Sequence, residues 1–157
     1  MRRMLLVFAV LFVGCAKSDK SASEPAMTAE PTATAISLAD VAGTWNGTIT
    51  KANNDTALVN IELTATAEPT GWVMKVANVK TPTQVTTVNA TSVVASGDSI
   101  VLEAGPFASV LRPGQQVKTH TVYHKEGDNL VADMWATYPA SGEMVALHSV
   151  ATRAAAK

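Results

Sequence analysis

The sequence predicts an all-β domain, an antiparallel up-and-down barrel of about eight strands, and three observations support this prediction. From Ile36 onward, turn-forming residues recur roughly every 8 to 15 residues, with no helical period of useful length between them. The segments between the turns are rich in valine and threonine, whose branched side chains suit a pleated, half-buried surface. Closure into a barrel removes unpaired strand edges, whereas a two-layer β-sandwich, the alternative, only limits them.

Eight segments are predicted as strands, and glycine, proline, asparagine or aspartate occupies each of the turns between them. The strands are residues 45–51, 57–66, 72–78, 84–96, 100–104, 117–125, 130–138 and 144–152. The fourth is long enough to be two strands broken at Asn89-Ala90. The one long connection, from Gly105 to Gln116, is partly apolar, and we expect it to lie across one end of the barrel.

Composition limits the classes of function. The chain has 157 residues, room for one domain of ordinary size, and its 12 basic and 13 acidic residues leave a net charge of −1. Nucleic-acid binding would need clustered positive charge, so no nucleic-acid partner is expected. The single cysteine excludes a disulfide within the chain and a cysteine-based zinc site.

The N-terminus has the order of a secretory signal. The basic start Met1-Arg2-Arg3-Met4 precedes an uncharged run from Leu5 to Val13, which as a helix spans about 13 Å, too short to cross a membrane. Phe12-Val13-Gly14-Cys15 then resembles the lipobox of bacterial lipoproteins. The resemblance implies cleavage before Cys15 and acylation of its thiol, which would anchor the chain in the bacterial cell envelope. By resemblance to the sorting rule of enteric bacteria, Ala16 after the cysteine implies the outer membrane. The alternative to a lipoprotein is an ordinary signal peptide with an incidental cysteine.

The chain therefore divides into three parts. Residues 1–14 are the expected lipoprotein signal peptide, residues 15–35 the lipidated cysteine with a disordered linker, and residues 36–157 the β-domain. Between Ala16 and Ala35 the only large apolar side chain is Met27. Such a segment buries too little surface to offset its ordering entropy, so we expect a flexible tether.

The start of the β-domain suggests a family. Gly43-Thr44-Trp45, preceded by Ser37–Ala42, resembles the opening of calycin-type barrels: lipocalins, fatty-acid-binding proteins and avidins. The resemblance implies that Trp45 packs at the closed end of the barrel against an arginine from a late strand, here Arg153. The T-D-Y motif of lipocalins is missing, and no helix follows the last strand. Residues 103–114 also resemble uncharacterised bacterial lipoproteins with a similar β-domain, which implies no activity.

Metal and catalytic motifs are weak. His120 and His124 on one strand would lie about 13 Å apart, too far to share a zinc ion unless His148 and a carboxylate such as Asp133 joined one of them. Gly97-Asp98-Ser99 matches the first block of G-D-S hydrolases, but the chain has no D-x-x-H partner motif. We therefore predict no metal site, no cofactor, no catalytic residues and no enzyme activity.

Two functions remain after the enzyme is set aside. In the first, the barrel binds a small apolar or amphiphilic ligand, and the large side chains Trp72, Met74, His124 and Trp135 are the candidate ligand-binding residues. In the second, the domain is a structural or protein-interaction module of the envelope. The first predicts an apolar cavity with an open end near Trp72, Met74 and Trp135; the second predicts a packed barrel with an exposed apolar patch.

Overall fold

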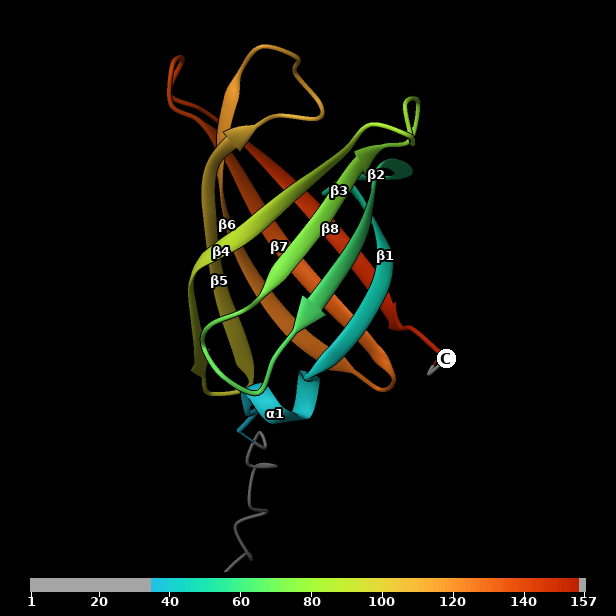
Figure 1. Cartoon of the computed structure of the whole chain (residues 1–157), viewed down its shortest axis with the longest axis vertical. Helices are drawn as coiled ribbons and strands as arrows, with labels where there is room; N and C mark the ends of the chain where they lie inside the picture. The colour runs from blue at the N-terminus through green and yellow to red at the C-terminus, as the bar shows by residue number, and fades with distance from the viewer. Residues whose placement is uncertain (1–34, 156–157) are drawn as a thin grey trace, which may run out of the picture. The chain divides into compact units, whose positions relative to one another are not determined.

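The computed structural model describes residues 35–155, which form a closed antiparallel barrel of eight strands in sequence order (Figure 1). The elements are α1 (Leu38–Val41), β1 (Gly43–Lys51), β2 (Asn54–Ala65), β3 (Val73–Asn78), β4 (Val85–Ser96), β5 (Ser99–Ala108), β6 (Gln116–Glu126), β7 (Asn129–Tyr138) and β8 (Glu143–Arg153). Each strand pairs with the next, and β1 closes the ring on β8. The predicted up-and-down barrel is confirmed, and the sandwich alternative is excluded because every described strand is paired on both sides.

The bounds of every strand differ by one or more residues from the predicted ones, and the fourth and fifth strands differ in form as well. The long fourth segment is one strand, β4, with a register shift between Ala90 and Ser92 in place of a break. β5 continues beyond its predicted end through Gly105-Pro106 to Ala108, because its pairing with β6 resumes at Phe107 after a second irregularity. The connection to β6 is therefore shorter than predicted and covers residues 109–115.

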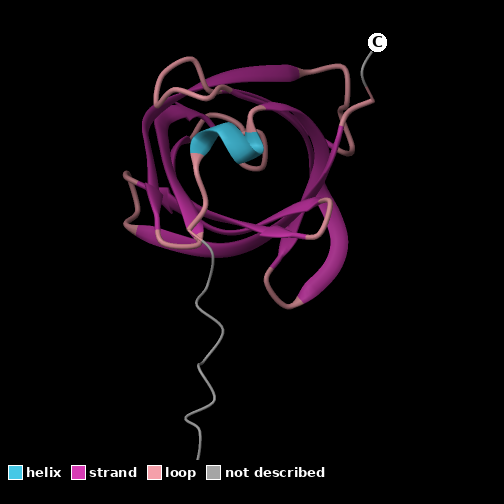
Figure 2. Ribbon diagram, turned by 90° about the horizontal axis from the view of Figure 1, so that it is seen from below, coloured by secondary structure: helices cyan, strands magenta, loops and turns pink. Residues whose placement is uncertain are grey.

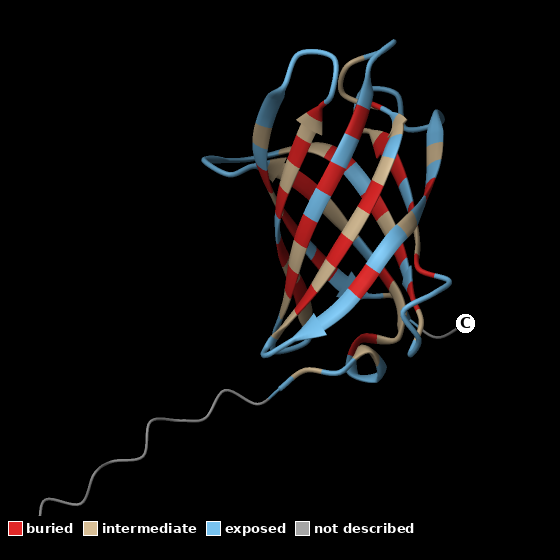
Figure 3. Cartoon of the chain, turned by 90° about the vertical axis from the view of Figure 1, so that its left-hand side faces the viewer, coloured by how far each residue is buried: buried red, intermediate tan, exposed pale blue. Residues whose placement is uncertain are grey.

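The core fills the inside of the barrel. Side chains alternate between buried and exposed along the strands, as expected when one face of each strand points inward (Figure 3). An eight-stranded barrel is just wide enough for its inward side chains to fill the interior. The largest apolar side chains buried there are Trp45, Trp72, Tyr123, Leu63, Ile100, Leu102 and Leu130.

The end of the barrel next to α1, here called the lower end, is plugged by side chains and by α1 itself, which lies across the opening (Figure 2). The indole N–H of Trp45 donates to the Val41 carbonyl at 2.8 Å. The Arg153 guanidinium lies 4.4 Å from the Trp45 ring centroid and donates to the Ala42 carbonyl at 2.6 Å. A Cβ at Gly43 would lie 2.5 Å from that guanidinium, which explains the glycine two residues before the tryptophan.

The barrel belongs to a compact unit of residues 32–157, called the barrel unit below. This unit contains every strand and every buried residue of the described chain, so it has what a domain needs to fold on its own. None of the helices within residues 35–155 has the length and apolar character needed to cross a membrane. The predicted signal peptide and Cys15 lie outside the described residues.

Gly47→Ala is predicted to destabilise the barrel strongly. Gly47 pairs with Ala151 at the β1–β8 junction, where an added Cβ would collide with the Val150 carbonyl oxygen and lie 2.6 Å from the Ala151 Cα. Both neighbours are backbone, so the two strands must separate, and we expect a loss of about 2–3 kcal/mol in unfolding free energy. Denaturant unfolding of the barrel unit measures this loss.

The matched control is Gly97→Ala. At Gly97 an added Cβ meets nothing within 4 Å, and only its positive φ of 61° opposes the change. This control should lose about 1–2 kcal/mol. A Gly47→Ala loss no larger than that of Gly97→Ala would contradict the close approach of β1 and β8.

Candidate functional site

A small apolar cavity lies in the upper half of the barrel, towards the end opposite α1. Its volume is about 40 Å³, enough for one or a few water molecules. Side chains from most of the strands and from the 109–115 connection surround it. They are Ile49, Val59, Met74, Val76, Phe107, Ser109, Val110, Leu111, Val117, Thr119, Met134, Ala136, Tyr138 and Leu147.

The connection between β5 and β6, residues 109–115, covers this cavity and is called the upper loop. Ser109 organises it: its backbone N–H donates to the Gln115 carbonyl at 2.9 Å, and its hydroxyl accepts from the Arg112 N–H at 3.1 Å. Val110 and Leu111 line the cavity from above. The expectation that this connection lies across one end of the barrel agrees with the structure.

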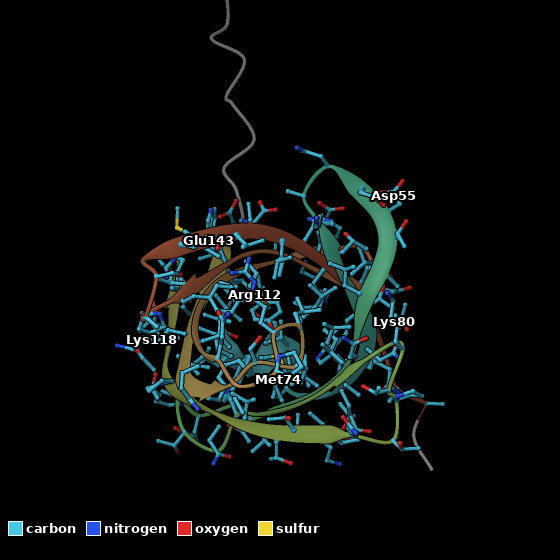
Figure 4. All side chains as sticks on the ribbon, turned by 90° about the horizontal axis from the view of Figure 1, so that it is seen from above. Asp55, Met74, Lys80, Arg112, Lys118 and Glu143 are labelled. Carbon is cyan, nitrogen blue, oxygen red and sulfur yellow. The ribbon has the colours of Figure 1, made fainter. Side chains whose placement is uncertain are left out.

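Three side chains from outside the loop hold it in place: Glu143, Tyr138 and Asn78. Arg112 donates two hydrogen bonds to the Glu143 carboxylate, at 2.7 and 2.5 Å, and its guanidinium lies 4.1 Å from the Tyr138 ring centroid. The Asn78 side-chain amide donates to the Val110 carbonyl at 3.0 Å. Figure 4 shows Arg112 over the mouth of the barrel, with Met74 labelled nearby and Glu143 at the rim.

The ion pair that holds the upper loop is exposed to solvent. The side chains of Arg112 and Glu143 are 33% and 48% exposed, so water screens their attraction. The hydrogen bonds from Arg112 lower the pKa of the Glu143 carboxyl, and the same bonds raise the pKa of Arg112. The upper end is thus closed by contacts that break more readily than the buried plug at the lower end.

Four buried hydroxyls lie in the interior in addition to those of Ser109 and Tyr138, which line the cavity 3.4 Å apart. Thr119, Thr121 and Tyr123 project inward from β6, and Ser149 projects inward from β8. None of the four hydroxyl oxygens has a hydrogen-bond partner among the residues that the structure describes. Burial raises the pKa of Tyr123, which keeps its hydroxyl protonated. Thr119 lines the cavity directly.

Met74 and Trp72 have different places in the barrel. Met74 lies in the cavity wall beside Val76. Trp72 is buried outside the cavity, where its indole N–H donates to the carbonyls of Thr66 at 3.0 Å and Glu68 at 2.9 Å in the β2–β3 connection. Of the four predicted ligand-binding residues, only Met74 contacts the cavity.

His124 and Trp135 differ from their predicted place inside the barrel. Both alternate with buried residues and face outward. The Trp135 ring stacks against the His120 ring with centroids 5.6 Å apart, and the His124 Nδ1 lies 3.1 Å from the Ser99 hydroxyl. On β7 both faces carry apolar side chains, so hydrophobicity alone did not distinguish the inward face from the outward one.

The other histidines pair with carboxylates on the outer surface. The His120 Nδ1 lies 2.5 Å from the Glu103 carboxylate, and the His148 Nδ1 lies 3.2 Å from that of Asp133. Within residues 35–155, no three histidine, cysteine, aspartate or glutamate side chains are grouped so as to hold a metal ion. These residues form separate pairs on the outer wall of the barrel.

The contacts that close the upper end and the buried hydroxyls were not among the features predicted from the sequence. Arg112 and Glu143 are 31 residues apart, and nothing in the sequence links them. The hydroxyls did leave a signal, because Thr119 and Thr121 alternate with the polar residues Lys118 and His120. Polar long side chains on one face of a strand indicate the solvent side, which places the intervening threonines inward.

Comparisons of the chain with protein-family models, with curated proteins and with solved structures find no match. Support for a function therefore comes from the geometry of the barrel. Its interior offers apolar contacts and neutral hydrogen-bonding groups. A buried plug closes the lower end, and an exposed loop closes the upper end.

Proposed function

We propose that the protein is a bacterial envelope lipoprotein, anchored through Cys15, whose barrel binds a small apolar or amphiphilic molecule in the cavity beneath the upper loop. The observation that supports ligand binding is the unequal closure of the barrel. The lower end is plugged by buried Trp45 and by α1, whereas the cavity lies under a loop held by an exposed ion pair. An apolar interior with one weakly closed end is an arrangement suited to ligand uptake.

The ligand has to displace the upper loop. Pockets for small molecules occupy about 300–1,000 Å³, far more than the cavity of about 40 Å³ seen with the loop closed. Withdrawal of Val110 and Leu111 would open the cavity to solvent, since both line it from the loop side. Met74 and Met134, which also line it, have unbranched side chains that repack easily and can enlarge the space.

The second candidate, an envelope interaction module, is favoured by the outer face of β7 and β8. Met144 and Val150 are 63% and 41% exposed on β8. Trp135 pairs with Ala146, two residues from Met144, so an aromatic and a flexible apolar side chain lie diagonally across the two strands. A partner protein that covers this face would not need the interior cavity.

Native mass spectrometry followed by organic extraction tests ligand binding. The barrel unit, isolated from a bacterial host or exposed to a lipid mixture, is expected to carry an extra mass that extraction releases. Ala136→Leu should abolish this mass, because the larger side chain fills the cavity that Ala136 lines. Ala146→Leu is the matched control, since Ala146 is exposed on the outer face of β8.

The two variants also separate the candidate functions. A bound mass lost in Ala136→Leu and kept in Ala146→Leu supports the carrier. A wild-type barrel unit that stays free of ligand in every lipid mixture would rule the carrier out and leave the interaction module. Retention of the mass in Ala136→Leu would place the ligand elsewhere on the barrel.

Glu143→Gln is predicted to accelerate ligand uptake. The change removes the charge that pairs with Arg112 and so weakens the closure of the upper loop, with an expected rise of about threefold or more in the association rate. Stopped-flow fluorescence with an environment-sensitive apolar dye measures this rate. Glu62→Gln is the control, because it removes a similar exposed ion pair, with Lys75 at 2.7 Å, from the outer wall.

The same ion pair gives uptake a defined pH dependence. Pairing lowers the pKa of Glu143 below its ordinary value of 4.5, so the closing contact is complete above pH 4.5 and is lost as the pH falls through the lowered pKa. Wild-type uptake should therefore accelerate only on the acid side of pH 4.5, and Glu143→Gln should show a weaker pH response. Equal pH profiles for the two proteins would contradict a closing role for this pair.

Anchoring is tested on the full chain. In a bacterial host, the wild-type protein is expected to incorporate labelled fatty acid and to sediment with membranes. Cys15→Ser removes the only thiol of the chain, so it should lose the label and the membrane association together. Membrane association that survives Cys15→Ser without any label would show that something other than acylation holds the protein there.

A further inference from the structure

The four buried hydroxyls, called the hydroxyl row below, lie on one wall of the barrel. Thr119, Thr121 and Tyr123 occupy successive inward positions of β6, so the row extends about 13 Å along the strand. Ser149 of β8 lies level with Tyr123, because both pair with Ala132 of the intervening strand β7. The row begins at the cavity, which Thr119 lines, and continues towards the lower end.

The opposite wall is apolar. The buried inward side chains of β2 to β5 include no polar group; they are Val59, Ile61, Leu63, Ala65, Met74, Val76, Val88, Val93, Ile100, Leu102 and Ala104. Among residues 35–155, no aspartate, glutamate, lysine, arginine or histidine is buried. The interior therefore presents hydroxyls on one side, hydrocarbon on the other, and no charge on either.

We infer that the hydroxyl row binds the uncharged polar head of an amphiphile, a hydroxyl, carbonyl or amide group, while the hydrocarbon part of the same molecule occupies the apolar cavity. This inference rests on the proposed ligand-binding function and specifies its substrate class. A hydroxyl is both donor and acceptor, so the row can satisfy either role of a neutral head group.

The energetics select neutral molecules. A buried hydroxyl without a partner is costly, and a ligand oxygen or nitrogen that supplies the missing partner removes this cost. A carboxylate, phosphate or ammonium head would lose its hydration without meeting an opposite charge, which opposes its burial strongly. The row thus favours a long-chain alcohol over a fatty acid or a cationic surfactant of the same chain length.

The path to the deeper hydroxyls passes a flexible side chain. Thr121 pairs with Met134, which also lines the cavity. Thr119 pairs with Ala136, and both residues line the cavity. A head group therefore meets Thr119 first, and reaches Thr121 once the Met134 side chain has repacked.

Calorimetric titration of the barrel unit at pH 8 tests the inference with three probes of equal chain length: decan-1-ol, decanoate and decyltrimethylammonium. The alcohol is expected to bind about tenfold or more tightly than either charged probe. Thr119→Val and Thr121→Val should each weaken the binding of decan-1-ol about threefold to tenfold, the effect of one hydrogen bond. Thr87→Val, on the exposed outer face of β4, should leave it unchanged.

Stability provides the second readout. Because Thr121 has no partner in the described structure, Thr121→Val is expected to leave the Tm unchanged or to raise it while weakening binding. A merely structural hydroxyl would show the reverse, a lower Tm with binding intact. Ser149→Ala serves as an independent variant of the same row should one of the threonine variants fold poorly.

The outcomes are distinct. Two results would contradict head-group binding by the hydroxyl row and leave the apolar cavity as a binding site. One is decan-1-ol binding that neither threonine variant changes, and the other is decanoate binding as tight as that of the alcohol. A fall in Tm for Thr121→Val would reveal an internal partner for that hydroxyl and overturn its role. Failure of all three probes to bind would overturn the row together with the proposed ligand-binding function.

Discussion

The pairing of β1 with β8 is the constraint on which the rest of the structure depends. Without it the eight strands form an open sheet with two unpaired edges and no enclosed interior. The register of this junction places Trp45 opposite Arg153 and Gly47 opposite Ala151. The first pair sets the guanidinium over the indole and forms the lower plug, and the second brings two backbones together where only a glycine fits. Closure and plugging of the barrel thus come from one short stretch of sequence.

The two ends of the barrel are closed by different kinds of interaction. At the lower end the indole N–H groups of Trp45 and Trp72 are buried and bonded to backbone carbonyls, so opening this end would expose large apolar surfaces and break hydrogen bonds together. At the upper end the loop is held by hydrogen bonds near the surface and by the exposed pair Arg112–Glu143. Motions that open the interior are expected at the upper end, since local opening follows the contacts of lowest stability.

The fold was largely predictable from the sequence, and the interior was not. Turn residues and valine-rich segments indicated the strands, and the short motif at Trp45 suggested the partner Arg153 that the structure places over its ring. The inward face of a strand is harder to predict, because a one-residue error in phase exchanges the two faces. On β7 both faces are apolar, and Trp135, predicted inside, lies outside. On β6 the alternation of Lys118 and His120 with threonines indicates the outward face, but this signal was not used to predict the inward hydroxyls.

A contact between residues distant in sequence was beyond prediction for a different reason. The upper loop is held by Glu143, which begins β8, and by Asn78, which ends β3, and their proximity to the loop depends on the tilt and closure of the whole barrel. Register irregularities near Ala90 in β4 and after Ala104 in β5 shift the faces of those strands further. Neither the contacts of the upper loop with Glu143 and Asn78 nor the register irregularities are indicated by a local sequence pattern, so the sequence alone does not predict them.

The unequal ends and the one-sided polarity of the interior together set the orientation of a ligand. A molecule that enters below the upper loop meets Thr119 before it meets the deeper Tyr123 and Ser149. If its polar head enters first, each step inward exchanges one hydroxyl contact for another, and its hydrocarbon chain remains in the cavity under Val110. If its tail enters first, the hydrocarbon lies against the unpartnered hydroxyls of Thr121, Tyr123 and Ser149, and these hydroxyls gain no hydrogen-bond partner. Head-first insertion of a neutral amphiphile is therefore the orientation that this interior favours.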